Sequence, residues 1–458
     1  MVEAIVIIGA GPAGVRAART LAKAGHRPVL IDENMRVGGQ IYRQPPPGAE
    51  RAPDALYGFE AAKAVAIHRA LDGLDIDYRP ETLVWNAREK ALDLAGPRGA
   101  ERLAFDQLIL ATGATDRSIP FPGWTLPGVF SLGGSQIALK AQGCAIGRCV
   151  VFAGTGPLLP LVAYQYAKAG AEVAAVLDTS SFATKLKAAP GLLVLPKLFA
   201  KGLYYLAQLK RRGIPVIERV EGFAVEGATA PEAITWRRGS ETGRIVCDAV
   251  GAGFGLRSET QLADLLGCAF AFDDLTRQWL PTKDAEGRAS ERHLYLAGDG
   301  SGIAGADAAE LAGERVAWTL LGDIGRPVDA ARVATLDRGL ARIQRFRRAI
   351  EAAYPFPHRF HADIPDTQIV CRCEGVTAGQ LKFQVEQREA SEMNRLKAYS
   401  RLGMGRCQGR MCASAGAELL SYWRDAEIGA VGRLRGQAPV KPVPVIVAPF
   451  ADSIADVA

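Results

Sequence analysis

The chain has 458 residues, which at roughly 150 residues per domain predicts about three domains. Hydrophobic residues make up 48% and charged residues 23%, an ordinary globular composition that excludes extended disorder and collagen-like repeats. The net charge of +6 comes from 55 basic and 49 acidic residues. Because this mild excess is spread along a long chain, nothing in it indicates nucleic acid as a partner.

The N-terminus leads directly into a hydrophobic strand, without a basic region or a small-residue cleavage site. We therefore read no signal peptide and expect a cytoplasmic protein, with peripheral membrane association left open. The longest uncharged run, between Arg148 and Lys168, holds glycines and prolines and is a poor transmembrane span. In a reducing compartment the 8 cysteines are expected to be thiols or metal ligands rather than disulfides.

The first dinucleotide-binding pattern starts at the N-terminus. An apolar strand at 4–8 leads into a glycine-rich turn, and an alanine-rich helix is predicted over 15–24. The three glycines allow the tight turn, the close approach of a pyrophosphate and the close packing of helix on strand. They are Gly9, Gly11 and Gly14.

A second strand at 28–31 ends at Asp32 and Glu33, where a carboxylate would accept the ribose hydroxyls. We favour Asp32 over Glu33 for this role. A glycine turn without a nucleotide is the alternative, but the strand, glycines, helix, second strand and acid occur together. The combination predicts a nucleotide site.

Two later segments, 108–114 and 293–300, are strands that end in small-residue turns. Both resemble motifs of the two-dinucleotide-binding-domain flavoproteins, the class of glutathione and thioredoxin reductases. The resemblance implies an α/β fold with two Rossmann-like domains and FAD at the first site. It also implies further FAD contacts at Gly39, Gln40, Thr112, Gly113, Gly298 and Asp299. A helix N-cap is the simpler role for Asp299, and the two roles are compatible.

The strand, turn and helix pattern occurs a second time from Arg148, with Gly154 and Gly156 in the turn and Asp178 after the next strand. Leu159 replaces the third glycine, so close pyrophosphate approach is in doubt. No arginine pair follows Asp178, which disfavours NADP. The second site is either an adenine-nucleotide site or a remnant of the fold, and the resemblance adds a second flavin as a further possibility.

Four other cysteines do not form a recognisable redox pair. Cys144 and Cys149 match neither common position of the redox disulfide in this class, and Cys247 and Cys268 are expected to be core thiols. We therefore do not expect disulfide reductase activity.

The sharpest pattern is a set of four cysteines near the C-terminus, namely Cys371, Cys373, Cys407 and Cys412. Two close pairs can bring four thiolates to one point, which suits tetrahedral zinc or a [2Fe-2S] cluster. Zinc sites usually have a wider gap between paired cysteines, and Arg372, Arg406 and Arg410 would offset the charge of a thiolate-bound cluster. These features favour iron and sulfur over zinc or free thiols.

The segment from Cys371 to Thr377 resembles the opening of the bacterioferritin-associated-ferredoxin-like [2Fe-2S] domain. The four-residue gap between Cys407 and Cys412 resembles the variant in the A (alpha) chain of octopine and nopaline oxidases, and in hydrogen cyanide synthase and D-hydroxyproline dehydrogenases. His358 and His361 are too isolated for Rieske ligation and are expected in a linker.

The predicted organisation is a split FAD domain with a second nucleotide-binding-like domain inserted. A basic helix at 335–353 would be a solvated linker or a docking surface, and the Pro- and Val-rich tail has no apparent internal partner. We expect the tail to pack on another subunit. The predicted ranges are 1–118 with 275–325 for FAD, 119–274 for the insert, 326–364 for the linker, 365–425 for the cluster and 426–458 for the tail.

We find no recognisable substrate-oxidising residues in the sequence, so the catalytic residues are unknown. The resemblance implies an electron-transfer role beside an amino-acid-oxidase-like flavoprotein (beta) subunit. It also implies a small ferredoxin-like protein in the same complex and a quinone as one acceptor. Two alternatives are a free-standing NADH-dependent reductase and a zinc-stabilised scaffold.

Overall fold

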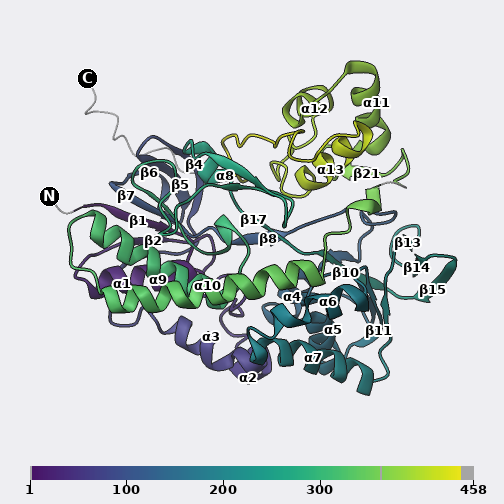
Figure 1. Cartoon of the computed structure of the whole chain (residues 1–458), viewed down its shortest axis with the longest axis horizontal. Coiled ribbons are helices and arrows are strands. Elements are labelled where there is room, and N and C mark those ends of the chain that lie inside the picture. Colours follow the sequence, from purple (N-terminus) through teal and green to yellow (C-terminus); the bar gives the residue numbers. More distant parts are fainter. Residues whose placement is uncertain (1–2, 362–363, 445–458) are drawn as a thin grey trace.

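The computed structural model describes residues 3–361 and 364–444 (Figure 1). Two parallel-sheet units lie side by side, and a small helical domain sits above their junction. In this part of the chain no helix is both long and apolar enough to cross a membrane. The predicted α/β fold class is confirmed.

The first unit is built on a parallel sheet in the order β20-β7-β1-β2-β3. In β1, Ile5 and Ile7 face helices α1 and α9, whereas Val6 and Ile8 face the antiparallel sheet β4-β5-β6. Alternation along one strand therefore fills two cores, one on each face. The parallel strands are β1 (Ile5–Ile8), β2 (Val29–Ile31), β3 (Asp77–Arg79), β7 (Gln107–Leu110) and β20 (Leu294–Leu296). The covering elements are α1 (Pro12–Lys23), α2 (Pro53–Tyr57), α3 (Ala61–His68), α9 (Ala306–Asp323), β4 (Leu83–Arg88), β5 (Ala91–Gly96) and β6 (Gly99–Ala104).

The second unit repeats this plan with the strand order β12-β11-β10-β16-β9. Val150 and Phe152 of β10 face the helices, and Val151 and Ala153 face the antiparallel sheet β13-β14-β15. The parallel strands are β9 (Val129–Ser131), β10 (Cys149–Thr155), β11 (Glu172–Asp178), β12 (Val216–Glu218) and β16 (Ala249–Phe254). The others are α4 (Leu132–Lys140), α5 (Leu158–Lys168), α6 (Phe182–Leu192), α7 (Pro196–Arg211), β13 (Gly222–Glu226), β14 (Ala233–Arg238) and β15 (Glu241–Val246).

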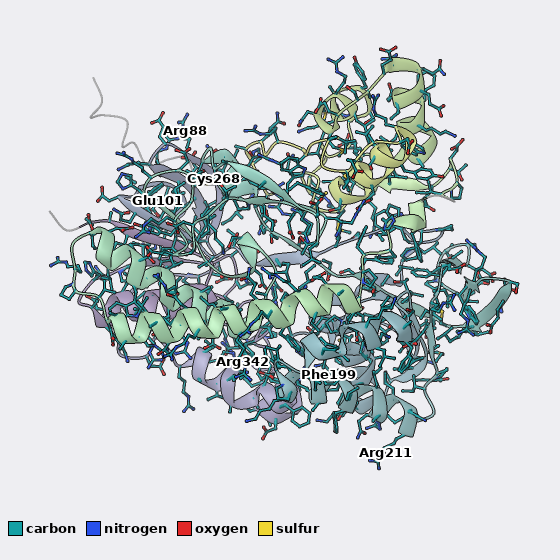
Figure 2. The ribbon with its side chains drawn as sticks, in the orientation of Figure 1. Arg88, Glu101, Phe199, Arg211, Cys268 and Arg342 are labelled. Carbon is teal, nitrogen blue, oxygen red and sulfur yellow. The ribbon has the colours of Figure 1, made fainter. Side chains whose placement is uncertain are left out.

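One antiparallel ribbon connects the two units, and a second one contacts the first unit and the small helical domain. One pairs β8 (Ala114–Asp116) with β17 (Leu256–Ser258), and the other pairs β18 (Phe270–Asp273) with β19 (Gln278–Pro281). Between them, Leu262 and Ala263 of α8 (Gln261–Leu265) and nearby Cys268 lie in the core of the first unit. Cys268 is labelled over this unit in Figure 2 and is buried. The predicted boundary at 274 is therefore too late, because these apolar side chains pack on β1 and β4 rather than on the insert.

Helix α10 (Ala330–Ala353) runs along both units (Figure 1) and is the predicted basic helix. Leu336, Ala349 and Ala353 are buried, and Gly191 of α6 lies so close that a Cβ there would be 2.7 Å from the Ala349 Cβ. Arg342 donates to the Val194 carbonyl at 3.0 Å and is labelled on this helix in Figure 2. The helix is packed on one face and solvated on the other.

The C-terminal domain has its own core, formed by β21 (Ile369–Cys371), β22 (Val376–Thr377), α11 (Ala378–Arg388), α12 (Met393–Ser400) and α13 (Ala413–Trp423). Ile428 and Val431 belong to this core, so the domain extends past the predicted boundary at 425. The chain then returns to the first unit, where buried Val440 donates from its N–H to the Trp85 carbonyl at 2.9 Å. The expectation of a tail without an internal partner is thus wrong at Val440 and Lys441, which contact the first unit; residues 445–458 lie outside the described part.

Candidate functional site

The first glycine turn lies at the carboxyl edge of the parallel sheet, between β1 and α1. Gly9 has φ +103°, and a Cβ on Gly14 would lie 1.8 Å from the Gly9 carbonyl oxygen. Both positions therefore require glycine. The N-cap residue of α1, Gly11, supplies no side-chain cap, so N–H groups at the start of this helix are available to an anion.

Three other predicted segments converge on this turn. A Cβ on Gly39 would lie 2.9 Å from the Gly11 Cα, and one on Gly298 would lie 2.9 Å from the Ala13 Cβ. A Cβ on Gly300 would lie 2.5 Å from the Thr112 hydroxyl oxygen. Backbones at this spacing form a narrow cradle that side chains would fill. Gln40 is exposed, and its side-chain carbonyl oxygen accepts from Arg43 at 3.0 Å.

Asp32 follows β2 and is buried beside the glycine turn. Its carboxylate accepts from the Ala10 N–H at 2.5 Å and from the Asn34 N–H at 2.7 Å. Burial raises the pKa of Asp32, although the hydrogen bonds from Asn34 and Ala10 work in the opposite direction. Glu33 is exposed instead and forms an ion pair with Lys441, which favours Asp32 as the ribose carboxylate.

Asp299 caps the entry to α9. Its carboxylate accepts from the Ala304 and Gly305 N–H groups at 2.8 and 2.9 Å. The N-cap-like role foreseen for Asp299 is present, and the side chain still lies next to the Gly298 contact with α1. The narrow backbone cradle, the helix N-terminus and the buried acid together fit the pyrophosphate and ribose of FAD.

The second glycine turn differs where the ligand would lie. Gly154 keeps the tight turn, since a Cβ there would lie 1.7 Å from the Gly253 carbonyl oxygen, but Leu159 is fully buried. Leu159 stands where the first turn has Gly14, so the close packing of helix on strand that a third glycine allows is absent. Asp178 already accepts from the Lys185 ammonium at 2.7 Å and from Ser180. The second turn thus lacks the third glycine, and its acid is already paired with Lys185.

The four C-terminal cysteines come together as two pairs. The thiols of Cys371 and Cys412 are hydrogen-bonded, and so are those of Cys373 and Cys407. The bond from Cys412 lowers the pKa of Cys371 to about 6, with help from the Gly403 N–H, and raises the pKa of Cys412 well above its usual value. Within residues 3–361 and 364–444, no three His, Cys, Asp or Glu side chains are placed to hold one metal ion. Two thiol pairs suit a cluster of two irons, each with two thiolates.

The surroundings of the thiols are close-packed. A Cβ on Gly405 would lie 2.2 Å from the Cys373 Cβ, so this position needs glycine. Arg372 lies over the Trp124 ring at 5.4 Å, and the Trp124 indole N–H donates to the Ile369 carbonyl at 2.7 Å. The second unit therefore supports the strand that carries Cys371.

The remaining cysteines lie away from this site. In the described part of the chain all eight are free, and burial raises the pKa of both Cys247 and Cys268 to about 11. Cys149 donates weakly to the Val246 carbonyl at 3.5 Å. The burial of Cys247 and Cys268 agrees with the interpretation of these two as core thiols, whereas Cys144 is exposed.

One segment that contacts both predicted cofactor regions was not found from the sequence, the bridging segment at residues 257–261. On one side the Thr112 hydroxyl donates to the Glu259 carbonyl at 2.6 Å, and the Glu259 N–H donates to the Gly113 carbonyl at 2.9 Å. We call Thr112–Gly113 the flavin turn. On the other side Gln261 donates to the Gln408 carbonyl at 2.7 Å, in the cluster loop at residues 407–412. Nothing in the local sequence marks this segment, because its partners are distant in the chain.

Comparison with known proteins agrees with this geometry. Residues 3–316 match the family described as pyridine nucleotide-disulphide oxidoreductase, and residues 369–421, which include all four cysteines of the cluster site, match the BFD-like [2Fe-2S] binding domain. The opine oxidase A chain of Rhizobium meliloti is 36% identical over 459 residues, which cover 96% of this chain and 86% of that protein.

The HcnB subunit of hydrogen cyanide synthase from Pseudomonas protegens is 35% identical over 464 residues, which cover 98% of this chain and 97% of that protein. Among solved structures, L-proline dehydrogenase from P. horikoshii has a TM-score of 0.70 at 18% identity, covers 98% of this chain and 79% of that one, and shows the shared fold. The chain is therefore an FAD- and [2Fe-2S]-dependent member of the pyridine nucleotide-disulphide oxidoreductase family, and it belongs with the opine oxidase A chains.

Proposed function

We propose that the chain is the electron-transfer subunit of a heteromeric amine dehydrogenase that oxidises an opine or imino acid. Relatives that are named as one subunit of an oxidase support an assembly with other subunits. In the proposed assembly an amino-acid-oxidase-like flavoprotein (beta) subunit oxidises the substrate, and a small ferredoxin-like subunit is a further partner. The electrons leave this chain toward an acceptor such as a quinone.

The chemistry sets the requirements on the chain. Oxidation of a C–N single bond to C=N releases two electrons and two protons, and water then hydrolyses the imine. Flavin handles electrons in pairs, whereas an iron-sulfur cluster takes one at a time. We propose that the first-site residues above hold FAD and that the cysteines Cys371, Cys373, Cys407 and Cys412 hold the cluster.

The observation that carries this proposal is the bridging segment. It bonds to the flavin turn through Glu259 and to the cluster loop through Gln261, so one short stretch holds both cofactor regions. Such an arrangement suits transfer between two fixed carriers within one chain. The replacement of the third glycine by Leu159 and the ion pair between Asp178 and Lys185 support a partner's flavin, rather than NADH, as the source of electrons.

The test is reconstitution. The chain is purified alone and together with an amino-acid-oxidase-like flavoprotein (beta) subunit, and dye reduction is followed with octopine, nopaline, glycine and hydroxyproline. We expect amine-dependent reduction only in the complex. Robust activity of the chain alone would contradict this division of labour.

A further inference from the structure

The bridging segment contains a buried carboxylate that faces the cluster loop. The Arg410 guanidinium donates from Nε to the Glu259 carboxylate at 2.6 Å, and the two side chains are only 12% and 9% exposed. The same guanidinium donates to the Cys407 carbonyl at 3.3 Å. The backbone of Glu259 thus forms hydrogen bonds with the flavin turn, and its side chain forms an ion pair with Arg410 of the cluster loop.

The charges around Glu259 keep it ionised. Burial alone would raise its pKa, but Arg410 and Arg257 outweigh that effect and hold the pKa of Glu259 below its usual value. Arg257 also donates to the Arg410 carbonyl at 3.1 Å, so it supports the cluster loop from the same segment. Removing one partner from a buried pair leaves the other charge uncompensated, which is costly in a protein interior.

We infer that Glu259 is the positioning residue that fixes the cluster loop on the flavin turn and balances the charge of Arg410 beside the cluster. Glu259 lies between the two cofactor regions without belonging to either motif. The inference rests on the presence of FAD and the [2Fe-2S] cluster, and not on the amine substrate or partner proposed above. Its failure is therefore distinguishable from failure of the proposed function.

The test uses the purified full chain with both cofactors and dithionite as the reductant. Glu259→Gln keeps the side-chain shape and the backbone contacts with the flavin turn but removes the charge. We expect unchanged FAD and iron content, a higher midpoint potential of the cluster, and an altered EPR spectrum of the reduced cluster. The potential rises because an uncompensated Arg410 favours the more negative reduced form. Amide exchange in residues 403–412 should accelerate by about tenfold or more, because a charged hydrogen bond is weakened.

Asp264→Asn is the matched control at the same interface. Asp264 is buried and accepts from Arg433 at 2.7 and 2.8 Å, but it holds residues 433–436 rather than the cluster loop. The Asp264→Asn variant should loosen residues 433–436 without changing the midpoint potential or the EPR spectrum of the cluster. Glu259→Asp should restore part of the wild-type potential.

If Glu259→Gln fails to fold, Arg410→Lys provides the same test, since it keeps the charge but loses the planar fork. We then expect faster exchange in the cluster loop with the potential nearly unchanged. A wild-type potential, EPR spectrum and exchange rate in Glu259→Gln, or identical behaviour of Glu259→Gln and Asp264→Asn, would overturn the inference. Slow, wild-type exchange in Arg410→Lys would do the same.

Discussion

The two dinucleotide folds of this chain share a backbone plan and differ in what they offer a ligand. The third glycine of the first turn, Gly14, is replaced in the second turn by Leu159, whose side chain is fully buried. The acid after the second strand accepts from neutral N–H groups in the first unit (Asp32) and from a lysine ammonium in the second (Asp178). A sheet and its covering helices can thus persist while a few side chains decide whether a dinucleotide fits.

The largest effect on the difference between the two folds is expected from Gly14→Ala in the first glycine turn. The new methyl group would lie 1.8 Å from the Gly9 carbonyl oxygen, so the glycine turn must move. Overpacking alone costs about 1–3 kcal/mol, and the displaced N–H groups would no longer meet the pyrophosphate. We expect loss of bound FAD, measured as the flavin absorbance per chain. Gly202→Ala, in open space on α7, should retain full flavin.

A second comparison uses the two acids. Asp32→Asn should weaken FAD binding by about tenfold or more, because hydrogen bonds to a charged acceptor are worth about 1.5–3 kcal/mol. Asp178→Asn removes the partner of Lys185 in the second unit and should leave the FAD affinity unchanged. Titration of the apoprotein with FAD, followed by fluorescence, measures both. Equal losses in the two variants would contradict our assignment of the FAD site to the first unit.

Lys140 on α4 is buried where the two units meet. Burial lowers the pKa of this lysine from 10.5 to about 8. Because the unfolded chain holds this proton up to a higher pH, stability should rise between about pH 8 and 10.5. Lys140→Met should remove that rise and stabilise the protein at pH 7 by on the order of 2 kcal/mol. Thermal unfolding at pH 7 and pH 10 checks this. The exposed Lys187→Met is the control, and a matching gain there would refute the explanation.

The smallest expected effect concerns NADH, which we expect not to reduce the flavin of this chain. Since Asp178 is bound by Lys185 and Leu159 replaces the third glycine of the second turn, micromolar NADH should not bleach the flavin in anaerobic stopped-flow measurements. Dithionite provides the positive control for reduction. Rapid bleaching by NADH would instead favour the free-standing reductase considered from the sequence.

The sequence predicted what is encoded locally. The strand, glycine turn and helix around Gly9 lie within about 20 residues, so each residue's role follows from its neighbours. The four cysteines of the cluster site were recognised from the sequence because few side chains bind metals as thiolates do and because their paired spacing is unusual. By contrast, Glu259 and Arg410 are 151 positions apart, and no periodicity connects them.

The predicted domain boundaries at 274 and 425 were wrong for the same reason, because the contacts that decide them are distant in the chain. Leu262 and Val440 are apolar residues in unremarkable segments, and only the folded chain shows that both pack into the core of the first unit. The salt bridge between Lys185 and Asp178 spans only 7 positions, but its geometry depends on how α6 follows β11. The pattern around the second turn therefore predicted the fold correctly and left its ligand undecided.

The discontinuous first sheet has a consequence for how the protein is made. β1 ends at Ile8, yet its sheet is completed by β20, which begins at Leu294. At roughly 5–20 residues per second, a ribosome needs about 15–60 seconds to synthesise the intervening chain. The inserted unit is synthesised completely within that time, so we expect the nascent protein to form its second nucleotide-like fold before β20 completes the first sheet.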